Sequence, residues 1–135
     1  MKRTIFCLVM IILACPLGTA QAASTSLNCT YRNNDGPPFQ LDVNPSGIVE
    51  TAQGGSALTF FNGLNADRAA ITYFSVTDDV IAYGSNSLVF SPKITDPVNV
   101  EIIVSLKGGI FVKSILHVEG FNFEAKYGNC KLVEK

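Results

Sequence analysis

The chain has 135 residues, of which 47% are hydrophobic and 16% are charged, with no tryptophan and one histidine. Its 10 basic and 11 acidic residues give a formal net charge of −1, and no basic run or stripe occurs along it. Phosphate backbones and anionic membrane surfaces both attract clustered cations, so the composition argues against nucleic acid as a partner and against electrostatic membrane binding.

The first 22 residues have the three regions of a cleavable signal peptide. Lys2 and Arg3 form a positive start, residues 5–13 are apolar, and Ala20-Gln21-Ala22 is a small-residue cleavage site. The apolar run is shorter than the ~20 residues of a membrane-spanning helix, and no later stretch is long and apolar enough to span. We expect cleavage after Ala22, no membrane insertion afterwards, and a single β-domain at residues 23–135 in the periplasm or outside the cell.

A second interpretation of the same region is a bacterial lipoprotein signal that is cut before Cys15. The segment Ile12-Leu13-Ala14-Cys15 loosely resembles a lipobox, and such processing would place a lipid anchor on Cys15. Leu13 is bulky for its position and Pro16 is unusual directly after the cysteine. The signal-peptide interpretation is therefore preferred, with the lipid anchor as the minor alternative.

Short apolar runs with a period of two follow the signal, separated by Gly, Pro, Asn and Asp, and no segment has a convincing amphipathic helical period. We expect an all-β fold, a small antiparallel β-barrel or β-sandwich of about 8–10 short strands. The predicted strands are Leu27–Tyr31, Phe39–Val43, Gly47–Thr51, Ala57–Phe61, Ala70–Val76, Val80–Tyr83, Ser87–Phe90, Val98–Leu106, Ile110–Val118 and Phe121–Tyr127.

The last three of these strands are predicted to form an antiparallel meander. A three-residue turn at Lys107-Gly108-Gly109 would oppose Leu106 to Ile110 and keep the charged Lys113 off the buried face. The second hairpin is expected to turn at Glu119-Gly120. It would oppose Leu116 to Phe123 and place Lys113 across from Lys126, a mildly unfavourable pair on the outer face.

Cys29 and Cys130 are the two cysteines that remain after signal cleavage. An even count in an exported chain favours a disulfide, and neither cysteine has a C-x-x-C neighbour or further metal ligands. We therefore expect one bridge that joins the N- and C-terminal ends, from the first strand to just beyond the last. In a barrel it would lie at or near the seam where the sheet closes.

No arrangement of residues predicts an enzyme, a cofactor site or a metal site. His117, the only histidine, is expected on the outer face across from Asn99 and diagonal to Glu101, as a solvated strand residue and not as a catalytic base. Asp78-Asp79 lacks the spacing of a calcium loop and is interpreted as a turn. Nucleophile motifs are also missing, so we expect no catalytic residues.

Most of the phenylalanine and tyrosine side chains are expected to fill the core, because a small β-domain needs bulky residues. Side-chain parity predicts that Phe111 and one member of the Phe60-Phe61 pair point outward. Phe61 and Phe111 are therefore the candidate exposed contact residues.

Two functions are weighed on these grounds. The first is a non-enzymatic binding protein of the bacterial envelope that caps or inhibits an unknown protein partner. The positions of Cys29 and Cys130, the size and the export signal resemble the membrane-bound/C-type group of periplasmic lysozyme inhibitors. The Ser-Gly-x-x-Tyr motif of that family is absent, since Tyr83-Gly84-Ser85 does not match it, so the resemblance implies an architecture and no functional residue. The alternative is a carrier of a small apolar ligand in a barrel cavity.

Overall fold

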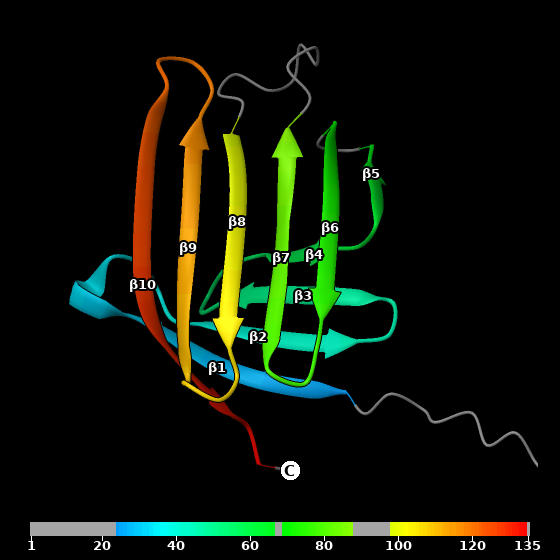
Figure 1. Ribbon diagram of the computed structural model, residues 1–135, viewed down its shortest axis with the longest axis vertical. Coiled ribbons are helices and arrows are strands. Elements are labelled where there is room, and N and C mark those ends of the chain that lie inside the picture. Colours follow the sequence, from blue (N-terminus) through cyan, green and yellow to red (C-terminus); the bar gives the residue numbers. More distant parts are fainter. Residues whose placement is uncertain (1–23, 67–68, 88–97, 135) are drawn as a thin grey trace, which may run out of the picture.

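A computed structural model describes residues 24–66, 69–87 and 98–134. The predicted signal peptide and Cys15 lie outside these residues. The described chain forms one sheet of ten antiparallel strands (Figure 1). The all-β prediction is confirmed, and the sheet is curled into a half-barrel. The part of the chain that is described contains no α-helix, only a short 3₁₀ turn, η1, at Arg32–Asn34.

The strands begin and end close to their predicted bounds, with three exceptions. The last strand continues to Leu132, five residues beyond the predicted end at Tyr127. Gly84-Ser85-Asn86, predicted to separate two strands, lies inside one continuous strand. Residues 62–67, predicted as a break, contain a strand of three residues. The end of the predicted strand Ser87–Phe90 lies outside the described residues. The observed strands are β1 Thr25–Tyr31, β2 Phe39–Asn44, β3 Gly47–Ala52, β4 Ala57–Phe60, β5 Gly63–Asn65, β6 Ala70–Val76, β7 Val80–Ser87, β8 Val98–Ser105, β9 Ile110–His117 and β10 Asn122–Leu132. Their order in the sheet is β4-β3-β2-β1-β10-β9-β8-β7-β6-β5.

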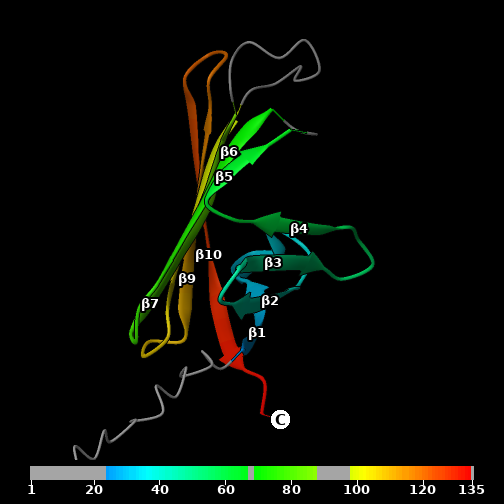
Figure 2. The same cartoon turned by 90° about the vertical axis from the view of Figure 1, so that its right-hand side faces the viewer.

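The curl brings β1–β4 against one face of the lower part of the β6–β10 sheet, and the upper part extends beyond them (Figure 2). Buried side chains fill the space between the two parts and form a single core cluster. Alternation along the strands produces this core, because every second residue points to the same face. Its members are Leu27, Cys29, Phe39, Leu41, Val43, Ile48, Phe60, Ile81, Tyr83, Ile102, Val104, Phe111 and Cys130.

The two edges of the sheet, β4 and β5, are consecutive in the chain and are joined by Phe61 and Asn62. Side-chain hydrogen bonds tie this connection to β6. The Phe61 amide donates to the Thr72 hydroxyl oxygen at 3.2 Å, and that hydroxyl donates to the Phe61 carbonyl oxygen. The Phe74 amide donates to the Asn62 side-chain oxygen at 3.1 Å. Thr72 is only 4% exposed, so this link belongs to the interior.

The predicted disulfide is confirmed. Cys29 on β1 and Cys130 on β10 are directly opposed, with their Cα atoms 4.1 Å apart and a sequence separation of 101 positions. Cys130 lies within the last strand, not beyond it, because β10 continues through Leu132. The bridge therefore joins the first and last strands in the middle of the strand order, while the sheet remains open between β4 and β5. The bridge thus lies where the first and last strands are brought together, as predicted, but the open edge of the sheet lies elsewhere.

The predicted register of the first hairpin of the meander is wrong by one residue. Val104 opposes Phe111 and Ser105 opposes Ile110, so the loop has four residues, from Leu106 to Gly109. Gly109 supplies the left-handed conformation expected of a glycine there, with φ +61°. Since one residue of slip inverts every side chain, Phe111 and Lys113 point inward.

The second hairpin has the predicted register. Leu116 opposes Phe123, and Lys113 opposes Lys126. Because β9 is inverted relative to the prediction, the side chains expected in the core from β10 lie on the outer face: Phe123 is 62% exposed and Tyr127 is 53% exposed.

Candidate functional site

The β9–β10 hairpin extends well above the level of β1–β4 (Figures 1 and 2), so strands β1–β4 do not cover its tip. All residues from 119 to 125 are exposed. Phe121 is 87% exposed, the highest value among the large apolar side chains of the described chain. Phe123, which follows it, is paired across the hairpin with Leu116, which is 37% exposed. We call Leu116, Phe121 and Phe123 the hairpin-tip cluster.

The backbone at the tip has an unusual conformation. Gly120 has φ +94° and Phe121 has φ +49°. Glycine adopts positive φ readily, whereas an aromatic residue there is uncommon and costs roughly 1–2 kcal/mol. An exposed ring contributes little burial to offset this cost. The folded state therefore holds a large apolar side chain at the tip of a turn where Gly or Asn would be more stable.

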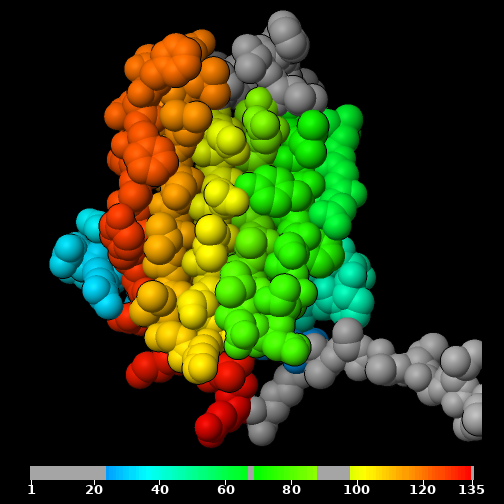
Figure 3. Space-filling view, in the orientation of Figure 1, coloured from blue at the N-terminus to red at the C-terminus, as the bar shows by residue number. Residues whose placement is uncertain are grey.

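The outer face of β7–β10 has a second apolar row below the tip, separated from the hairpin-tip cluster by the row of Glu101, Ser114 and Ala125. Ala82, Ile103, Val112 and Tyr127 form one cross-strand row, since each is paired with the next. Ile103 is 43% exposed between the fully buried Ile102 and Val104, which confirms that it points to the opposite face. Figure 3 shows this face, where the side chains of β7–β10 lie side by side without a covering layer.

The two predicted contact residues do not form this surface. Phe111 is 1% exposed and packs edge-on against Tyr31 and Phe39, with ring centroids 5.1 and 5.2 Å away. The prediction of an outward Phe111 is therefore wrong. Phe61 is half-buried in the connection between the edge strands β4 and β5, while Phe60 is in the core. The alternation of side chains in the sequence would predict an outward Phe121 and Phe123 only if the register of β9 were assigned correctly.

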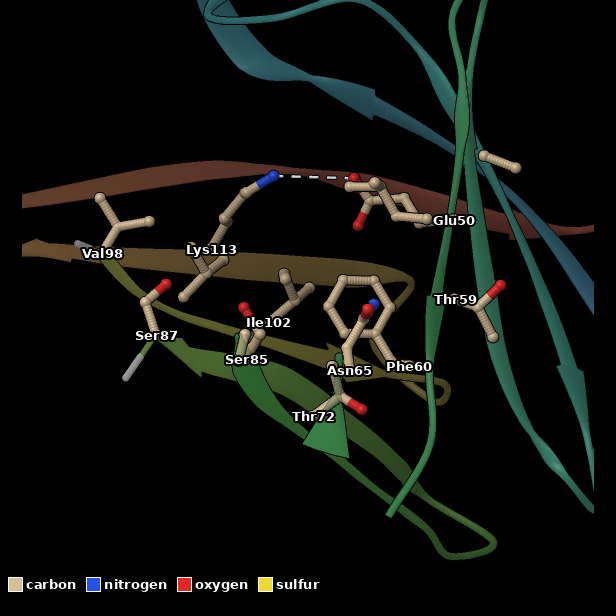
Figure 4. Close-up of a pocket in the computed structure, with 14 residues that line it drawn as sticks. Glu50, Thr59, Phe60, Asn65, Thr72, Ser85, Ser87, Val98, Ile102 and Lys113 are labelled. Atoms are coloured by element: carbon tan, nitrogen blue, oxygen red, sulfur yellow. Dashed lines mark ion pairs between the residues drawn. The ribbon is translucent and has the colours of Figure 1, made fainter. Parts of the chain in front are cut away.

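The interior above the apolar core contains a polar cluster that joins β3, β7 and β9. The Tyr83 hydroxyl donates to Glu50 Oε2 at 2.8 Å, and Lys113 Nζ lies 3.6 Å from Glu50 Oε1 (Figure 4). The Glu50 side chain is 9% exposed and that of Lys113 is 19% exposed. The inward lysine, which appeared unfavourable from local sequence, has its counter-ion on a strand more than 60 residues earlier.

Burial is the main influence on the pKa of the tyrosine side chains Tyr83 and Tyr31 at this cluster. It raises the pKa of Tyr83 far above its ordinary value of 10.0, and the negative charge of Glu50 raises it further. Burial also raises the pKa of Tyr31, although the neighbouring Lys113 acts in the opposite direction. Both phenols are therefore hydrogen-bonding groups and not bases at neutral pH.

A cavity of about 340 Å³ lies above this cluster, between β4 and the inner face of β6–β9 (Figure 4). Its floor contains Glu50, Lys113 and Ile102. Hydroxyl and amide groups line part of the wall, and valine, leucine and phenylalanine side chains line the rest. The lining residues are Glu50, Ala57, Leu58, Thr59, Phe60, Asn65, Ala70, Thr72, Ser85, Ser87, Val98, Val100, Ile102 and Lys113.

The remaining candidate residues are separate from this cavity and from each other. His117 opposes Val98 and Asn122, not Asn99, and the alternation along β8 and β9 puts Glu101 on the other face of the sheet. Asp78 and Asp79 are exposed in the turn between β6 and β7, as predicted. Within the described ranges no group of three or more His, Cys, Asp or Glu side chains could hold a metal ion.

Known proteins do not identify the chain. No protein family, no curated protein and no solved structure matches it. Within the described ranges, no helix is long and apolar enough to cross a membrane.

Proposed function

We propose that this protein is an exported, non-enzymatic binding protein that caps or inhibits a partner protein. The observation that carries the proposal is Phe121, an aromatic side chain 87% exposed on a left-handed backbone at the tip of a projecting hairpin. Aromatic anchors of this kind supply much of the binding energy at protein interfaces, and backbone strain is concentrated at functional positions.

The hairpin-tip cluster and the charges beside it define the partner. Leu116, Phe121 and Phe123 would enter an apolar recess, because burial of exposed apolar surface is the main gain available to them. Glu119 and Glu124 are exposed on either side of the two phenylalanines. Lys126 lies 3.6 Å from Glu124 and neutralises part of this charge. The complementary partner has an apolar recess with a weakly basic rim.

Export is part of the same proposal. The disulfide supports it, because bridges persist in oxidising compartments such as the periplasm and the cell exterior. Mass spectrometry of the protein purified from an export-competent host tests this part directly. We expect a chain that begins at Ala23 with no free thiol; a lipid-modified chain that begins at Cys15, or an uncleaved chain, would overturn soluble export.

Affinity capture from envelope extracts and exported proteins of the host tests the binding itself. The wild-type protein, Phe121→Ser and Leu64→Ser are compared as baits. Leu64 is 57% exposed on β5, at the opposite edge of the sheet, so it is a matched control for lost exposed apolar surface. We expect one saturable partner retained by the wild type and Leu64→Ser and lost with Phe121→Ser. Equal retention by all three baits, or no saturable partner, would contradict the proposal.

A further inference from the structure

The cavity has the dimensions and the mixed lining of a small-molecule site. Its volume of about 340 Å³ lies at the lower end of the range for ligand pockets. Polar groups enter it from two strands, with Ser85 and Ser87 on β7 and Asn65 on β5. Val98, Val100 and Leu58 provide apolar wall between them. A bound molecule would therefore contact hydrogen-bonding and apolar surface at the same time.

The charges at the floor decide which molecules fit. Among the described residues that line the cavity, Lys113 is the only cation and Glu50 is the only anion. They neutralise each other, so an ionised ligand would meet one attractive and one repulsive charge and would lose its hydration without net compensation.

A neutral polar group has no such penalty. The 3.6 Å separation of Lys113 Nζ and Glu50 Oε1 exceeds the roughly 2.7–2.9 Å of a charge-assisted hydrogen bond. An ammonium group has three donors, so it can donate to a ligand oxygen while it stays beside Glu50. The serine hydroxyls of the lining can both donate and accept.

We infer that this cavity binds a small uncharged amphipathic molecule, with a hydroxyl or amide group toward Lys113 and an apolar body against Val98 and Val100. The site is distinct from the hairpin-tip cluster, and its occupancy does not depend on a protein partner. It also differs from an apolar carrier site, because the floor requires a hydrogen-bonding group on the ligand.

The test is an NMR titration with four six-carbon probes in two matched pairs: 1-hexanol and hexylammonium, which share a hexyl chain, and hexanamide and hexanoate, which share a pentyl chain. We expect saturable amide shifts in β4, β7 and β8 with the two neutral probes. The two charged probes are expected to bind at least tenfold more weakly. No saturable shift with any probe, or equal binding of charged and neutral probes, would overturn the inference.

Two substitutions on the same strand provide the matched control. Ser85→Leu fills the cavity, whereas Asn86→Leu places the same side chain on the exposed outer face. We expect hexanamide shifts to disappear in Ser85→Leu and to persist in Asn86→Leu. Ser87→Leu takes the place of Ser85→Leu if that variant does not fold. Binding that survives a cavity-filling substitution in a folded protein would show that the probe sits elsewhere.

Discussion

The ring of Phe111 lies over Gly128, its cross-strand partner on β10, and occupies the space that a side chain at position 128 would need. A Cβ atom built on Gly128 meets both the Phe111 ring and the Thr30 carbonyl oxygen. Gly128 is thus the residue that lets Phe111 point inward. This relationship determines which side chains of β9 point into the core, and it leaves the aromatic side chains of β10 on the outer face of the sheet.

Gly128→Ala is therefore expected to lower the free energy of unfolding by about 2–3 kcal/mol through overpacking against a buried ring and a backbone oxygen. Urea denaturation measures the change. Gly108→Ala is the control, because its Cβ would meet the Ser105 hydroxyl at 3.1 Å in an exposed turn. A loss at Gly128 no larger than the loss at Gly108 would contradict the inward placement of Phe111.

The positions of most strands could be predicted from the sequence, because Gly, Pro, Asn and Asp separate runs with a period of two. The inner face of β8 was also predictable, since Val98, Val100, Ile102 and Val104 recur at every second position, with Asn99, Glu101 and Ser105 among the residues that alternate with them. The face of β9 was not, because that strand is apolar on both sides: Phe111 and Ile115 point one way, Val112 and Leu116 the other. Local pattern cannot decide between two such faces.

The deciding interactions for β9 come from distant parts of the chain. Glu50 accommodates the inward Lys113, and Gly128 accommodates the inward Phe111. Neither partner is visible in the alternation of β9 itself. The hairpin-tip cluster is not predicted by the sequence for the same reason, because Phe123 lies on the outer face only when β9 has the observed register. The disulfide was predictable, since only two cysteines follow the signal.

The Glu50–Lys113 pair is expected to show strong coupling. Lys113→Met leaves the Glu50 carboxylate largely buried without its counter-charge, and we expect a loss of about 3 kcal/mol. The double variant Glu50→Gln/Lys113→Met removes both charges and keeps an acceptor for Tyr83, so it should recover most of that loss. Denaturant unfolding of the wild type, both single variants and the double variant completes the cycle. Strictly additive losses would show that the two side chains do not interact.

Alkaline pH is expected to unfold the protein in part through Tyr83. Its phenol titrates near pH 10 in the unfolded chain, whereas burial and Glu50 keep the folded phenol protonated to higher pH. The unfolded state then binds fewer protons, so the free energy of unfolding falls as pH rises above about 10, by about 1.4 kcal/mol per pH unit for this group.

Tyr83→Phe removes that contribution. At pH 7 it is expected to be less stable by about 1–2 kcal/mol, because Glu50 loses a hydrogen-bond donor. Between pH 10 and 11 its stability should decline less steeply than that of the wild type. Equal slopes in urea denaturation across this pH window would rule out the protonated, buried phenol.

The disulfide is expected to provide a large part of the stability. It joins two residues that are 101 positions apart in the sequence, and a constraint of this size on the unfolded chain corresponds to roughly 4–5 kcal/mol. We expect Cys29→Ser/Cys130→Ser to lose about this amount in denaturant unfolding. Reductant should destabilise the wild type similarly and leave the double variant unchanged. A double variant within 1 kcal/mol of the oxidised wild type would contradict this account.

Phe121→Asn separates a role in contact from a role in folding. Asn accepts positive φ more readily than Phe, and the lost ring is 87% exposed. We therefore expect the free energy of unfolding to stay the same or rise by about 0.5–1 kcal/mol. A loss of more than about 1 kcal/mol would show that the Phe121 ring supports the fold.

The central claim is that the hairpin tip holds Phe121 in place for a partner. The most direct test is the affinity of the captured partner for Phe121→Asn, measured on the same preparation whose stability is determined. The expected result is at least a tenfold weaker affinity in a protein that is as stable as the wild type or more stable. An unchanged affinity in that folded variant would contradict the claim.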